Sequence, residues 1–306
     1  MYLTDSGEAP VLPPAPSPEG FAARLRSLDA SGLTEAHIQS ALERTVDNAR
    51  YWQDPDGDDV LAGLPAVVEA LGPIAEQVIA APGAQWWWQP LQVEQWAIEW
   101  RSFDDPAPLP KNPNEALAKW ARQERAEEVR AAWERPSDPS ANWSGTWWSI
   151  PHGLVQTVGR LPAGLSLVED SLGWEEATAI AVRGSGRTLE VQTAEDWMAL
   201  CRRFPLEVTA SRRHDWFRTT ARSGRWVIPD WEKAASEWDA AHLSVAAYLN
   251  AAGRALDLGD GTATVLAGWN LGSTIWLNDV ARELPGQRQQ WRHERDSNHG
   301  HWTRVL

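Results

Sequence analysis

Arginines and aromatic residues crowd one short segment of this chain, from Arg202 to Arg225. The segment carries seven arginines against two carboxylates, Glu207 and Asp215, although the whole chain has a formal net charge of −14. A guanidinium group binds phosphate or carboxylate through paired hydrogen bonds, and an indole ring can stack on a flat ligand. We therefore predict a site for an anionic small molecule, either a nucleotide or a phosphorylated metabolite. The predicted ligand-binding residues are Arg212, Arg213, Arg218, Trp216 and Trp226.

The same arginines have an ordinary structural explanation. In a chain with 42 aspartates and glutamates, they can pair with carboxylates inside the protein or lie along tryptophan faces. Charge runs are also commonly solvated surfaces. The sequence leaves both explanations open.

Three titratable residues are placed to supply acid–base chemistry. Glu169 and Asp170 are adjacent carboxylates after an apolar stretch. Such pairs can act as general acid and base or stabilise a developing positive charge. His214 stands between Arg213 and Asp215, where a histidine can exchange a proton near neutral pH. If the protein is an enzyme, we expect Glu169, Asp170 and His214 to be its catalytic residues and group transfer to be its reaction. Whether it is an enzyme is left open.

The sequence predicts no metal site and identifies no cofactor. His293, His299 and His301 have no acidic or cysteine partner at a metal-binding spacing. Residues 54–58 imitate the start of a calcium loop, but the glycine is misplaced and Pro65 occupies the twelfth position.

Tryptophan is the second anomaly of the composition. The chain has 21 tryptophans but only 4 phenylalanines and 3 tyrosines. Since Trp and Arg dominate protein interfaces, the alternative function is a non-catalytic interaction module that docks a protein partner through exposed Trp and Arg anchors. Residues 86–88, taken as a strand, would expose at least one ring. Coding bias is another explanation, because the chain also uses 25 arginines and only 3 lysines.

Charge and hydropathy limit the partners. An acidic surface repels phosphate backbones and anionic lipids, so we expect neither nucleic acid nor membrane as a partner. No apolar run reaches the roughly 18 residues of a membrane helix, and the N-terminus lacks the features of a signal peptide. The single cysteine, Cys201, cannot form an intrachain disulfide and is predicted to be buried. A cytoplasmic location is expected.

These residues must be positioned by an α+β fold. We predict a helical N-terminal part followed by a mixed, mainly antiparallel sheet region with packed helices. By composition, residues 1–19 form a disordered Pro-rich lead-in, residues 20–135 a mainly helical part with a short strand region, and residues 142–306 an α+β part that carries the candidate site.

Local patterns predict several individual elements. Residues 96–100 alternate as in a half-buried strand, and capping residues start helices after Thr34, Asn112 and Thr193. Apolar runs on both sides of residues 184–186 predict a hairpin. An apolar stripe predicts one helix from Asp230 to Gly253.

Overall fold

The computed structural model describes residues 17–105, 107–169, 173–286, 288–295 and 300–305. Asp170 and the first sixteen residues of the predicted lead-in lie outside this range. The fold is α+β, as predicted. The chain divides into two compact units, Met1–Leu33 with Pro55–Ala81 and Thr34–Asp54 with Pro82–Leu306. The boundary predicted at residues 136–142 lies within the second unit.

The first unit is helical. Its elements are α1 (Pro18–Arg26), α3 (Gly57–Ala62) and α4 (Pro65–Ala80), and α1 packs along α4. The Ser17 hydroxyl accepts from the Gly20 backbone N–H at the start of α1, and Asp56 forms a capping box at the start of α3.

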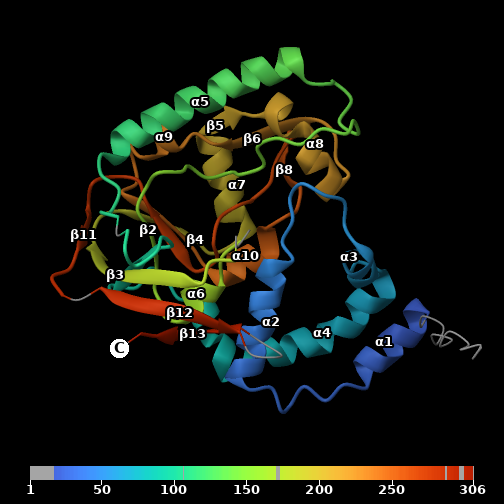
Figure 1. Ribbon diagram of the computed structural model, residues 1–306. Helices are drawn as coiled ribbons and strands as arrows, with labels where there is room; N and C mark the ends of the chain where they lie inside the picture. Colours follow the sequence, from blue (N-terminus) through green and yellow to red (C-terminus); the bar gives the residue numbers. More distant parts are fainter. Residues whose placement is uncertain (1–16, 106, 170–172, 287, 296–299, 306) are drawn as a thin grey trace, which may run out of the picture. The chain divides into compact units, whose positions relative to one another are not determined.

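A large mixed sheet organises the second unit (Figure 1). Within the described residues its strand order is β13-β12-β3-β1-β2-β10-β7-β4, and β11 also pairs with β3. All neighbours are antiparallel except β4 and β7. The strands are β1 (Gln95–Glu99), β2 (Gln156–Val158), β3 (Glu176–Gly184), β4 (Thr188–Val191), β7 (Ala240–Leu243), β10 (Ser273–Trp276), β11 (Ala281–Glu283), β12 (Gln289–Arg295) and β13 (Gly300–Arg304).

Large side chains stand opposite alanines in the middle of this sheet. The register pairs Trp96 with Ala181 and Ile98 with Ala179. Alternate residues of a strand share one face, so Trp96, Ile98 and Trp100 all pack on the same side, over the small residues of β3. The predicted strand at residues 96–100 is thereby confirmed, with β1 ending at Glu99.

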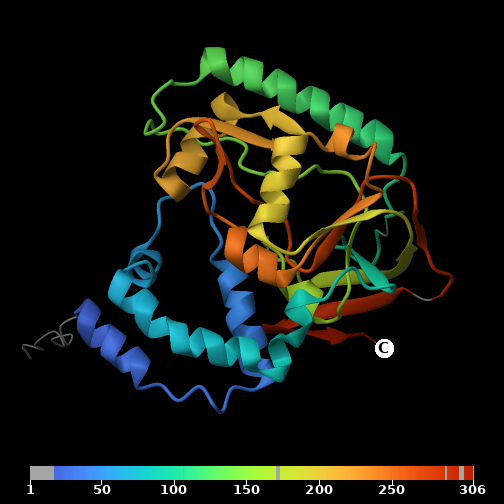
Figure 2. The same cartoon turned by 180° about the vertical axis from the view of Figure 1, so that it is seen from behind.

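The second unit also contains a smaller sheet and several helices. The strand order of the smaller sheet is β5-β6-β9-β8. Figure 1 shows the long helix α5, in green, running across β5, α8 and α9, all of which it contacts. Figure 2, from behind, shows α7 in yellow beside α10 in orange. The elements are β5 (Pro205–Glu207), β6 (Arg225–Pro229), β8 (Leu256–Gly259), β9 (Thr262–Thr264), α5 (Pro113–Glu134), α7 (Ala194–Arg203), α8 (Thr209–Thr220), α9 (Trp231–Ala234) and α10 (Val245–Ala251).

The second unit also contains α2 (Glu35–Asp47), the 3₁₀ helix η1 (Pro82–Trp88) and α6 (Ala163–Ser166). The predicted helix starts at Thr34, Asn112 and Thr193 are confirmed; Thr34 and Thr193 form capping boxes, whereas the Asn112 side chain makes no capping hydrogen bond. Cys201 is fully buried on α7, and burial raises the pKa of its thiol to about 12. No helix in the described part of the chain is both long and apolar enough to cross a membrane.

Three local predictions are wrong. The predicted hairpin does not form, because β3 pairs with β1, β11 and β12 whereas β4 pairs in parallel with β7. The helix predicted from Asp230 to Gly253 is interrupted, because Ala240–Leu243 is strand β7 in the large sheet. Residues 86–88 belong to η1 and not to a strand. In each case, pairing or packing with distant residues overrides the local pattern.

His242 gives the sheet a pH-dependent stability. It is 5% exposed on β7, and its Nδ1 lies 2.9 Å from the Thr274 hydroxyl, directly opposite on β10. Burial lowers the pKa of His242 from 6.5 to about 4. The unfolded chain therefore binds a proton more readily than the folded chain between these values. The stabilising contribution is complete above pH 6.5 and is lost as the pH falls to about 4.

We predict that the free energy of unfolding falls by about 3 kcal/mol more between pH 7 and pH 4 in the native protein than in His242→Gln. Urea denaturation at intervals across this range measures the difference. Parallel pH profiles for the two proteins would show that His242 is not buried in its neutral form.

Candidate functional site

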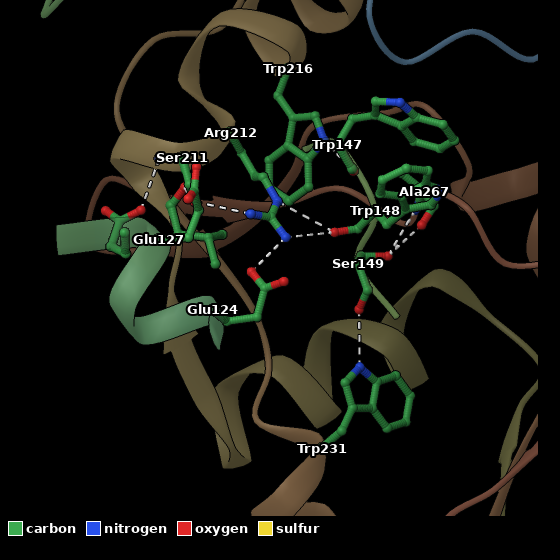
Figure 3. A network of polar contacts seen from close by, with 12 residues as sticks. Glu124, Glu127, Trp147, Trp148, Ser149, Ser211, Arg212, Trp216, Trp231 and Ala267 are labelled. Atoms are coloured by element: carbon green, nitrogen blue, oxygen red, sulfur yellow. Dashed lines mark hydrogen bonds and ion pairs between the residues drawn. The ribbon is translucent and has the colours of Figure 1, made fainter. Parts of the chain in front are cut away.

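Arg212, the centre of the predicted anion site, is bound inside the protein. Its side chain is 1% exposed, and Nη2 lies 2.7 Å from the Glu124 carboxylate on α5. Nη2 also donates to the Trp148 carbonyl oxygen at 3.1 Å, and Nη1 donates to the Ser211 hydroxyl at 3.1 Å. Figure 3 shows the guanidinium between Glu124 and the backbone of Trp148. Arg212 therefore pairs with a carboxylate inside the protein, as the ordinary structural explanation of the arginine segment predicts.

The backbone from Trp147 to Ser149 is the centre of this network. Its three successive carbonyl oxygens accept hydrogen bonds from the indole of Trp216, the guanidinium of Arg212 and the indole of Trp231. Figure 3 shows these donors converging on the segment. Because the segment has no neighbouring strand there, side chains satisfy the buried carbonyl groups that a sheet would otherwise satisfy.

The other predicted ligand-binding residues are also engaged in the fold. Arg213 donates to the Ser137 carbonyl oxygen at 3.3 Å, and Arg218 donates to the Asp215 carboxylate at 3.3 Å. Trp216 and Trp226 are 0% exposed, so neither ring presents a face to a ligand. The prediction that they stack on a ligand is therefore corrected: both are core residues. None of the five predicted residues lines either of the two cavities described below.

Glu169 is the catalytic candidate with the most distinctive surroundings. Its carboxylate oxygen Oε1 accepts hydrogen bonds from the buried hydroxyls of Tyr51 and Tyr248. Its backbone N–H donates to the Asn270 side chain at 3.1 Å. Burial, together with the nearby charge of Glu169, raises the pKa of both tyrosines well above the usual value of 10. The tyrosines therefore stay protonated and anchor the carboxylate.

His214 belongs to a different network from Glu169. It is 1% exposed on α8, and burial, followed by the neighbouring charge of Arg213, lowers its pKa. Burial therefore favours the neutral form of the ring. The structure does not bring His214 and Glu169 into one catalytic arrangement, and Asp170 lies outside the described residues.

A cleft of about 250 Å³ lies between α2 and the end of the large sheet formed by β12 and β13. Its aromatic wall contains Trp100, Trp174 and Trp302, all half-buried. The rings of Trp100 and Trp174 stack with centroids 4.7 Å apart and an interplanar angle of 13°. Trp302 tilts against Trp100 at 5.8 Å and lies next to His293 across the β12–β13 pair.

The opposite wall of the cleft is polar and comes from one face of α2. Ser40, Glu43, Arg44 and Asp47 follow one another at helical spacing and all line the cleft. The Gln39 amide donates to the Glu43 carboxylate at 3.0 Å, which holds this carboxylate in place. The large apolar residues of α2, Ile38, Leu42 and Val46, are buried.

A second cavity, of about 270 Å³, lies where β1 and β2 part. Ala97 of β1 pairs with Thr157 of β2. The next residues of β1, Ile98 and Glu99, are not paired with β2. Trp100 and Val168 line both this cavity and the cleft. Since Val168 directly precedes Glu169, the two tyrosine hydrogen bonds anchor the loop that borders both cavities.

The sequence did not identify the residues of the cleft. Trp174 and Trp302 lie far from Trp100 in the sequence and were not distinguishable from the other tryptophans. A polar stripe on α2 is what any surface helix shows. Only the alternation on β1, which places Trp100 beside Trp96 and Ile98, was a usable signal.

Comparison with known proteins gives no assignment. No family model, curated protein or solved structure matches this chain. Within the described residues there is no group of three or more His, Cys, Asp and Glu side chains arranged to hold a metal ion. The function must therefore be inferred from the geometry.

The structural role of Arg212 predicts a large effect on stability. In Arg212→Leu, the largely covered carboxylate of Glu124, 11% exposed, loses its cation, and the Trp148 carbonyl oxygen loses two donors. We expect the free energy of unfolding to fall by about 3–5 kcal/mol, and Arg212→Leu/Glu124→Leu to recover part of this loss. Chemical denaturation measures both.

Arg225→Leu is the matched control, because Arg225 and its partner Glu207 are 64% and 39% exposed. Its effect should stay below about 1 kcal/mol. Unchanged stability of Arg212→Leu, combined with stabilisation of the native protein by inorganic phosphate, would restore the anion site.

Proposed function

We propose that this protein binds a small, uncharged, polyhydroxylated ligand with the chemistry of a sugar ring in the cleft between α2 and the three tryptophans. The observation that carries the proposal is the pairing of two unlike walls, one aromatic and one with alternating charge. The sequence predicted a small-molecule site at the arginine segment. We propose the cleft as the small-molecule site instead.

The aromatic wall suits the C–H face of a sugar ring. Indole rings offer a large, rigid apolar surface, and their N–H groups add a polar edge. Binding sites typically combine such surfaces with a few well-placed polar groups. Trp100, Trp174 and Trp302 are half-buried, so each keeps part of its surface accessible.

The polar wall favours an uncharged ligand. An anion would meet the carboxylates of Glu43 and Asp47, and a cation would meet the guanidinium of Arg44. Hydroxyl groups can donate to the carboxylates and accept from the guanidinium, so a polyol satisfies both kinds of group. Charged groups of both signs therefore disfavour a nucleotide or a phosphorylated metabolite in this cleft.

An interaction module remains the second candidate because of α5. Trp133 is 87% exposed there, and Val129, one turn earlier, is 62% exposed. A large exposed aromatic residue beside an aliphatic one is a typical anchor for a protein partner. Group transfer and a cytoplasmic location remain predictions from the sequence.

Titration calorimetry with a panel of methyl glycosides tests the proposed function. We predict that Trp174→Ala and Trp302→Ala each weaken binding of the preferred glycoside by about tenfold, because each removes stacking area. Trp133→Ala is the matched control, since it removes an exposed indole outside the cleft, and it should leave the affinity unchanged.

Two results would contradict the proposed function. One is the absence of binding by every glycoside of the panel. The other is equal loss of affinity in Trp133→Ala and in the two cleft variants.

A further inference from the structure

The cavity between β1 and β2 adjoins the cleft. Both are bordered by Trp100 and Val168, so a molecule seated against the tryptophans lies one side chain away from the second cavity. The two volumes are similar, about 250 and 270 Å³. A ligand longer than one sugar ring therefore has a place for its second part.

The second cavity has fewer charged side chains than the cleft. Its aliphatic wall includes Ile98, Leu154, Val155, Val158 and Ile180. The cleft has three ionisable side chains on α2 alone, whereas among the described residues Glu99 is the only ionisable side chain that lines the second cavity. The Glu99 carboxylate is paired with Arg101 at 3.2 Å.

The uncharged polar groups of this wall are mostly satisfied by the protein itself. The Thr157 hydroxyl donates to the Gln95 side chain at 3.0 Å and accepts from the Trp276 indole at 2.9 Å. The Asn270 side-chain oxygen accepts from the backbone of Glu169, and Ser273 donates to the Asn270 carbonyl oxygen. An apolar group can enter without leaving these polar atoms unpaired, which is the cost that usually opposes its burial.

We propose that the second cavity receives the apolar part of the same ligand, so that the ligand is a glycoside with a small alkyl or aryl group. This inference rests on the proposed function of the cleft and adds a class of ligand to it. The sugar ring lies between the tryptophans and α2, and the apolar group extends past Trp100 and Val168 into the cavity. A volume of roughly 150 Å³ holds a benzene ring, and the second cavity, which is open to solvent and lined by both aliphatic and polar groups, offers about 270 Å³.

The test compares methyl, butyl and hexyl β-glucosides and β-galactosides by calorimetry. Each methylene group that enters the cavity should raise the affinity about fourfold, up to the capacity of the cavity. Ala97→Leu, which adds a branched side chain to the wall, should remove the dependence on chain length but leave the affinity for the methyl glycoside unchanged. Leu109→Trp, on the half-buried part of the wall, is the second filling variant in case Ala97→Leu does not fold.

Cyclohexanol alone separates this inference from the function of the cleft. It should raise the melting temperature of the native protein and not that of the filled variants, because it binds only the folded state with an open cavity. If methyl glycosides bind and chain length has no effect, the apolar compartment is overturned and the cleft stands. If no glycoside binds but cyclohexanol stabilises only the open form, the compartment stands and the cleft is overturned. If neither binds, both are overturned.

Discussion

A buried guanidinium group holds three separate parts of the larger unit together. Arg212 on α8 pairs with Glu124 on α5 and donates to the backbone of Trp148. Removing two charges from water costs several kcal/mol, and such a pair is tolerated only when further hydrogen bonds satisfy its remaining atoms. The bonds to Trp148 and Ser211 meet this condition. The most basic segment of the sequence therefore serves the fold.

The same network reaches the cleft through a series of contacts. Trp147, whose carbonyl oxygen is bound by Trp216, stacks on Tyr51 with ring centroids 5.1 Å apart. Tyr51 donates to Glu169, and the residue before Glu169, Val168, borders both cavities. The position of this cavity wall thus depends on a buried polar core, and a defect at Arg212 is expected to disturb ligand binding from a distance.

Local chemistry explains which parts of the fold were predictable from the sequence. The alternation from Trp96 to Trp100 and the capping group at Thr193 act within a few residues, and both identified their elements correctly. The pairing of β4 depends on β7, about fifty positions away in the sequence. The predicted helix is interrupted because β7 lies between β4 and β10 in the sheet. The arginine segment was ambiguous, because a guanidinium that binds phosphate and one that binds Glu124 look the same in a sequence. The cleft tryptophans are brought together only by the order of the strands.

The central claim is that Trp100, Trp174 and Trp302 bind an uncharged sugar-like ligand, whereas Trp216 and Trp226 are core residues. The indole N–H resonances of ¹⁵N-labelled protein, assigned by single Trp→Phe variants, test it most directly. A titration with the preferred glycoside should shift the resonances of the three cleft tryptophans and leave those of Trp216 and Trp226 in place, and ATP should shift neither set. Unmoved cleft resonances, or shifts of Trp216 and Trp226 caused by ATP, would contradict this account.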